Sequence, residues 1–164
     1  MQKLKTKLKT NLKGAKKIAF LGVGSDIRGD DAAGILITEN LKKIFKAEKN
    51  IKVFIGQTTP ENLTGEIIKF SPTHVVILDA IDTNKKAGKI IFLDKNKIRG
   101  ISFSTHRLPI RIMADYLNIS IKCETIIIGI QPKLLDFCGK MSVPVKKSVD
   151  TITKLFKELA NELF

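Results

Sequence analysis

The chain has no tryptophan, one tyrosine and two histidines among its 164 residues. It therefore offers little Tyr or Trp surface on which nucleic-acid bases could stack. The net charge of +13, from 29 Lys plus Arg against 16 Asp plus Glu, would otherwise favour a nucleic-acid partner. However, the lysines are scattered along the chain, and no RNA-binding or helix-turn-helix motif accompanies them. We expect no nucleic-acid partner. A composition rich in Lys and Ile instead indicates a thermophile protein with surface ion-pair networks.

Cysteines and long apolar runs are also scarce. The only two cysteines, Cys123 and Cys138, form no C-x-x-C pair. No apolar run approaches the length of a membrane span, and the basic N-terminus lacks the apolar core of a secretory signal. We therefore expect a cytoplasmic protein with reduced thiols and no membrane association.

The length of the chain suits one domain with a hydrophobic core. Residues 1–17 contain seven lysines, and Leu4, Leu8 and Leu12 recur at helical spacing. This pattern predicts a short amphipathic helix in a basic N-terminal extension. The extension is expected to precede a single domain over residues 18–164.

Apolar runs and helical periodicities alternate along this domain, which predicts an α/β fold. The run Gly88–Asp94 follows the preceding strand after a short turn, so it should be an antiparallel edge strand. The other strands should form a mainly parallel sheet with helices on both faces. Strands are expected near residues 18–21, 51–55, 75–78, 88–94 and 125–130, with helices near 31–45, 59–70, 110–117 and 142–163.

Residues 18–34 organise the chain as a strand, a glycine turn and the start of a helix. A dinucleotide fingerprint would need glycine at position 27, which is Ile27, and an acidic residue after the second strand, which ends Ile55-Gly56-Gln57. A nucleotide-binding protein is therefore a disfavoured alternative. The carboxylates in this loop, Asp30 and Asp31 among them, would repel phosphate. They suit a cation, or Asp30 caps the helix while Asp31 interacts with its dipole.

Two further polar groups belong to the carboxyl edge of the predicted sheet, where open parallel sheets bind ligands. Asp79 directly follows the apolar run Val75–Leu78, and His106 lies in a polar loop ahead of a helix. His74, at the opposite end of its strand, is expected at the surface. Together Asp31, Asp79 and His106 form a set of two carboxylates and one imidazole, which suits nickel or zinc and leaves positions open for water or substrate.

Three motifs in register resemble those of the [NiFe]-hydrogenase maturation endopeptidases. They are Gly22–Gly34, Leu78–Asp82 and Ser104–Pro109, and the similarity continues through Gly129–Pro132 to the last helix. The likeness is greatest to the branch that serves hydrogenases of the formate hydrogenlyase type. It implies a twisted five-stranded sheet between helices, in agreement with the periodicity.

The resemblance implies an endopeptidase that removes the C-terminal extension of a hydrogenase large-subunit precursor after nickel insertion. The family's nickel ligands correspond to Asp31, Asp79 and His106, and the nickel is carried by the precursor. The rival interpretation is a non-catalytic nickel-sensing or chaperone module that acts on the same precursor.

The sequence is compatible with two catalytic mechanisms. In the preferred one, a metal ion assists the attack of water on the peptide carbonyl. Asp30, Asp79 or Asp82 could accept the proton if one of them lies within hydrogen-bond reach. A carboxylate dyad of Asp30 and Asp79 is the alternative.

Overall fold

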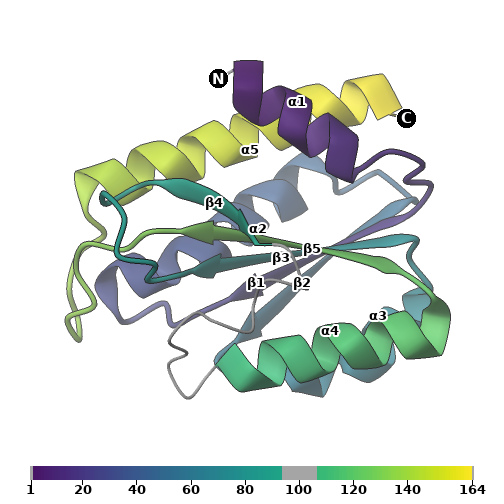
Figure 1. Cartoon of the computed structure of the whole chain (residues 1–164), viewed down its shortest axis with the longest axis horizontal. Helices are drawn as coiled ribbons and strands as arrows, with labels where there is room; N and C mark the ends of the chain where they lie inside the picture. The colour runs from purple at the N-terminus through teal and green to yellow at the C-terminus, as the bar shows by residue number, and fades with distance from the viewer. Residues whose placement is uncertain (1, 94–106, 164) are drawn as a thin grey trace.

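Five strands form one sheet in the computed structural model, which describes residues 2–93 and 107–163 (Figure 1). The strand order is β2-β1-β3-β5-β4. The first four strands in this order are parallel, and β4 runs antiparallel to β5. The predicted fold class and the antiparallel edge strand are confirmed. The strands are β1 (Ile18–Val23), β2 (Ile51–Gln57), β3 (His74–Ala80), β4 (Ile90–Leu93) and β5 (Glu124–Ile130).

Helices cover both faces of this sheet, as parallel strands joined by crossover helices require. Figure 1 shows α1, α2 and α5 above the sheet and α3 and α4 below it. Short 3-10 turns precede α2 and α3. The helical elements are α1 (Gln2–Asn11), η1 (Gly29–Ala32), α2 (Ala33–Ile44), η2 (Pro60–Leu63), α3 (Thr64–Phe70), α4 (Arg107–Ile121) and α5 (Val143–Leu163).

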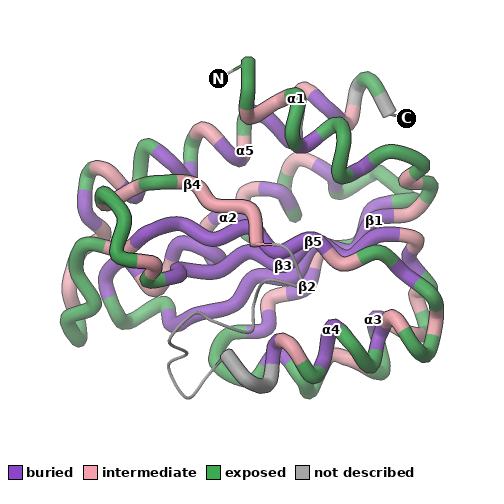
Figure 2. The backbone as a smooth tube through the Cα atoms, in the orientation of Figure 1, coloured by how far each residue is buried: buried purple, intermediate pink, exposed green. Residues whose placement is uncertain are grey.

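Alternate residues of each central strand supply two separate hydrophobic cores. In β3, Val76 and Leu78 pack with α2 and α5, whereas Val75 and Ile77 pack with α3 and α4. All seven residues of β3 are buried, and the central strands form the buried layer in Figure 2. Burial on both faces explains why the sequence shows a continuous apolar run here rather than alternation.

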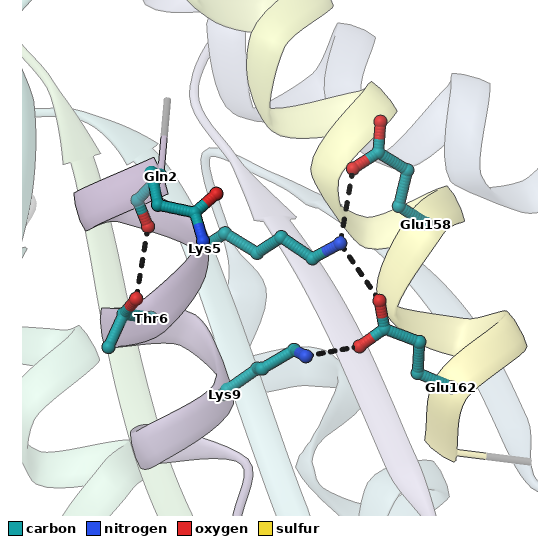
Figure 3. Close-up of polar contacts among 6 residues, drawn as sticks. All are labelled: Gln2, Lys5, Thr6, Lys9, Glu158 and Glu162. Carbon is teal, nitrogen blue, oxygen red and sulfur yellow. Dashed lines mark hydrogen bonds and ion pairs between the residues drawn. The ribbon is translucent and has the colours of Figure 1, made fainter.

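The lysine-rich N-terminus forms the predicted helix and docks on α5. Leu8 and Leu12 are each 1% exposed and belong to the core between α1 and α5. On the outside, Lys5 Nζ lies 2.8 Å from a carboxylate oxygen of Glu162, and Lys9 Nζ lies 2.5 Å from the other (Figure 3). Hydrophobic burial thus anchors α1, and surface ion pairs border the contact. The domain boundary after residue 17 stays a prediction.

His74 is buried, so the expectation of a surface residue was wrong. It lies in the middle of the sheet, because it is in register with Ile18 of β1 on one side and Glu124 of β5 on the other. Its Nδ1 is 3.1 Å from Thr73 Oγ1. Burial lowers the pKa of His74, and the nearby Glu124 carboxylate partly opposes this shift.

The segment that leads into α3 begins without a side-chain cap. Thr59 makes no side-chain capping hydrogen bond, and a 3-10 turn beginning at Pro60 precedes α3. Thr64 Oγ1 instead donates to the carbonyl of Glu61 at the junction of the two segments. None of the described helices combines the length and the apolar composition that crossing a bilayer needs.

Candidate functional site

A close contact between α2 and the ends of two strands defines the carboxyl edge of the sheet. A Cβ atom at Gly34 would overlap the backbone carbonyl oxygens of Leu78 and Val23. Only glycine lets the first turn of α2 approach β1 and β3 so closely. Asp31 lies three residues before Gly34, and Asp79 directly follows Leu78. The contact therefore brings the segments that carry these two carboxylates to one place, and η1 contacts β3 there.

Asp31 lies in η1 and is half-buried. Its backbone N–H donates to the carbonyl of Arg28 at 2.9 Å, which closes the turn. Gly24 has a φ of +130°, and a Cβ there would overlap the backbone carbonyl of Asp31. The glycine turn after β1 thus fixes the position of the Asp31 backbone.

Asp79 is the penultimate residue of β3 and is 6% exposed. It is in register with Gly129 of β5. Strand alternation assigns it to the same face as Val75 and Ile77, which is the face that α3 and α4 cover. The first residue of α4 is Arg107. His106 directly precedes it in sequence and lies outside the described residues.

Asp30 has a structural environment quite different from that of the adjacent Asp31. Its side chain is 0% exposed and accepts four hydrogen bonds from one distant segment. The donors are the backbone N–H groups of Lys133 (2.7 Å), Leu134 (2.9 Å) and Ser142 (2.6 Å), and the Ser142 hydroxyl (2.8 Å). Burial alone would raise the pKa of Asp30, but these hydrogen bonds lower it below its usual value.

The capping role considered for Asp30 was therefore wrong. Neither η1 nor α2 has a side-chain capping hydrogen bond, and the carboxylate instead joins the loop after β1 to the loop before α5. It is inaccessible to solvent and saturated with donors. This environment argues against Asp30 as the proton acceptor and against the dyad of Asp30 and Asp79, and it favours Asp79 or Asp82 as the base.

Gln131 organises the loop after β3, a role that the sequence pattern did not predict. Its Oε1 accepts from the backbone N–H groups of Thr83 (2.8 Å) and Lys85 (3.1 Å). Its Nε2 donates to Asp82 Oδ1 at 3.0 Å, and the N–H of Asn84 donates to the same oxygen. Asp82 therefore stabilises a turn. The sequence feature that could have indicated this role is the position of Gln131 directly after β5, at the same sheet edge as Asp79.

Among the described residues, no three His, Cys, Asp or Glu side chains are close enough together to hold a metal ion. His106 does not belong to that part of the chain. Asp31 and Asp79, two carboxylates on rigid segments, could supply the oxygens of a donor set, and His106 could supply the nitrogen. The ligand set itself stays a prediction.

Solved structures first define the class of protein that has this fold. The structure is similar to the crystal structure of the [NiFe] hydrogenase maturation protease HycI from Thermococcus kodakarensis KOD1, with a TM-score of 0.85 and 33% identity. The match covers 92% of this chain and 96% of the other. A second match, the crystal structure of the Hydrogenase 3 maturation protease, has a TM-score of 0.73 at 34% identity and covers 84% and 87%.

Sequence comparisons then identify the family. The HycI hydrogenase maturation protease model matches residues 35–158. The Hydrogenase 3 maturation protease of Escherichia coli K12 is 35% identical over 134 residues, which span 81% of this chain and 84% of that protein. A protein of Methanocaldococcus jannaschii is 36% identical over 166 residues, which span 98% of each chain. The chain belongs to the hydrogenase maturation protease family. It is a peptidase, which confirms the endopeptidase prediction.

Proposed function

We propose that this peptidase removes the C-terminal extension of a nickel-loaded [NiFe]-hydrogenase large-subunit precursor, with Asp31, Asp79 and His106 contacting the nickel that the precursor carries. The observation that supports the proposal is the contact of Gly34 with Val23 and Leu78. Because α2 approaches both strand ends, the segments of Asp31 and Asp79 lie together at the edge where parallel sheets bind ligands.

The chemistry of the donor set fits this substrate. Two carboxylates and an imidazole suit a borderline divalent ion such as nickel better than a hard ion or a cuprous one. When bound, nickel supplies Lewis-acid polarisation of the peptide carbonyl. The chain's own groups orient the substrate and move the proton. Proton transfer from the attacking water to the leaving amine is assigned to a carboxylate at this strand end, either Asp79, through an oxygen that does not contact nickel, or Asp82.

The direct test uses two forms of one substrate. The purified protein is incubated with the large-subunit precursor loaded with nickel, and separately with the same precursor stripped of nickel. We expect a single new C-terminus, found by intact-mass measurement, only in the loaded sample. No cleavage of the loaded precursor would contradict the proposed substrate. Equal cleavage of both forms would contradict the role of nickel.

We also propose that the protein works in the cytoplasm. Cys123 and Cys138 are both in the thiol form, Cys123 buried and Cys138 exposed, as expected for a reducing compartment. Fractionation of cells from the source organism, with immunodetection of the protein, tests this. Recovery in the soluble cytoplasmic fraction is the expected result.

A further inference from the structure

Large apolar side chains are exposed beside the candidate site, on two loops at the same sheet edge and on the first residue of α5. One loop follows β1 and the other joins β5 to α5, and Figure 2 shows the second as largely exposed. Phe137 is 71% exposed and Val143 is 67% exposed. We call this surface the loop patch; it consists of Ile27, Leu134, Leu135, Phe137 and Val143. Several large apolar side chains exposed in one region of a folded protein commonly mark an interaction site.

Hydrogen bonds hold the two loops of the patch together. The N–H of Cys138 donates to the carbonyl of Ile27 at 2.7 Å, and the N–H of Asp30 donates to the carbonyl of Leu134 at 2.9 Å. The buried Asp30 carboxylate accepts from Lys133, Leu134 and Ser142, which lie in the second loop or at its end. The exposed side chains therefore stand on a pre-organised backbone, and little ordering entropy opposes binding to them.

Phe137 is held outward by a turn with an unfavourable backbone conformation. The N–H of Gly139 donates to the carbonyl of Asp136 at 3.1 Å, which makes Phe137 and Cys138 the two central residues. Cys138 has a φ of +56°, a region that favours glycine. Strained backbone of this kind persists where the surroundings enforce it and is concentrated at functional sites. Here the turn projects an aromatic side chain into solvent, where it contributes little to the core.

The charges around the loop patch indicate what kind of partner it fits. Residues 26–28 and 133–147 carry five basic and two acidic side chains, and all seven are exposed. A second copy of this chain, with its own net charge of +13, is a poor partner because the two molecules repel each other. A surface with an apolar centre and an acidic rim is complementary to the patch.

We propose that the loop patch docks the hydrogenase large-subunit precursor, through an apolar surface bordered by carboxylates, and so delivers the cleavage site to Asp31 and Asp79. This inference rests on the proposed function. Asp30 connects the loop patch to the candidate site. It precedes Asp31 in the chain, and its carboxylate holds the second loop of the patch. Docking through Phe137 and Leu135 contributes to the binding of the precursor and not to the chemical step.

The test compares KM and kcat for cleavage of the nickel-loaded precursor. We expect the double variant Phe137→Ser/Leu135→Ser to raise KM by about tenfold, the scale at which central apolar anchors act in interfaces. The kcat should stay within about twofold of the wild type, since the double variant leaves the reacting groups in place. The matched control is Ile112→Ser/Ile119→Ser, which removes two exposed apolar side chains from α4. This control should leave KM unchanged.

The outcomes separate the docking proposal from the proposed function. If the wild type leaves the loaded precursor uncut, the proposed function fails and the docking proposal with it. If the wild type cuts and the Phe137→Ser/Leu135→Ser variant has an unchanged KM, only the docking proposal fails. An equal rise in KM for the α4 control also overturns it. So does a wild-type dimer in sedimentation that the loop variant dissociates, because the patch would then bind a second copy.

Discussion

The carboxylate of Asp30 accepts hydrogen bonds from both the backbone N–H and the hydroxyl of Ser142, a residue 112 positions further along the chain. Ser142 directly precedes the first residue of α5. One buried side chain thus connects the loop that carries Asp31 with the start of the last helix. Because the group is ionised and removed from solvent, its contribution to stability depends on all of its donors remaining in place.

We expect Asp30→Ala to lower the free energy of unfolding by about 3 kcal/mol, because it leaves buried N–H donors without an acceptor. Urea unfolding followed by circular dichroism measures the change. Asp26→Ala, at an exposed position in the same loop, is the control and should change stability by less than about 0.5 kcal/mol. Equal losses in the two variants would contradict a specific role for the Asp30 network.

The same network predicts how stability changes in acid. The pKa of Asp30 is lowered in the folded protein, so the unfolded chain binds a proton more readily. The contribution is therefore complete above the unfolded-state pKa of 3.8 and is lost as the pH falls through that value toward the lower folded-state pKa. Unfolding free energies of the wild type and Asp30→Asn should differ most at about pH 6 and converge toward about pH 2. A difference that is constant with pH would show that the pKa is not lowered.

Two helical glycines should respond in opposite directions to alanine. At Gly65 in α3, an added methyl would have nothing within 4 Å, so Gly65→Ala should stabilise the protein by about 0.5–1 kcal/mol through helix propensity. At Gly34 the added methyl would overlap Leu78 and Val23, so Gly34→Ala should destabilise it. Thermal melts of both variants give the comparison. If Gly34→Ala also stabilises the protein, the close approach of α2 to the strand ends is incorrect.

The candidate site gives the prediction for activity. Asp31→Asn, Asp79→Asn and His106→Ala should each slow processing of the nickel-loaded precursor by at least about a hundredfold, since a lost metal contact costs more than the loss of a group that only supports a ligand. Neither Asn substitution changes side-chain volume appreciably or opens a cavity, and thermal melts beside the assay check that both variants are folded. Asp150→Asn, an exposed carboxylate on α5, is the control and should process normally. Normal processing by any of the three site variants would remove that residue from the site.

Local patterns were sufficient for most of the fold. The run Val75–Leu78 predicted a buried central strand because β3 has helices on both of its faces. The short turn before β4 predicted its antiparallel direction, since no crossover helix fits there. The periodicity of Leu4, Leu8 and Leu12 likewise predicted α1. In each case the sequence pattern that carries the prediction spans only a short segment of the chain.

The differences between neighbouring polar residues could not be predicted in this way. Asp30 and Asp31 are adjacent and chemically identical, yet Asp30 is saturated by donors from residues 133–142 while Asp31 is half-buried at the sheet edge. Likewise, His74 lies at the end of its strand, a position that suggested exposure, but strands on both sides bury it. Such environments depend on contacts between segments far apart in sequence, and no local pattern contains them.

The packing of α1 against α5 has a consequence for biosynthesis. The apolar face of α1 packs in one core cluster with α5, which lies far later in the chain, so Leu8 stays partly uncovered during synthesis until α5 has been made. Domains generally fold as units during translation, and exposed apolar surface promotes aggregation in the interval. The lysines of residues 1–17 keep this N-terminal segment strongly charged and so oppose its association with other nascent chains.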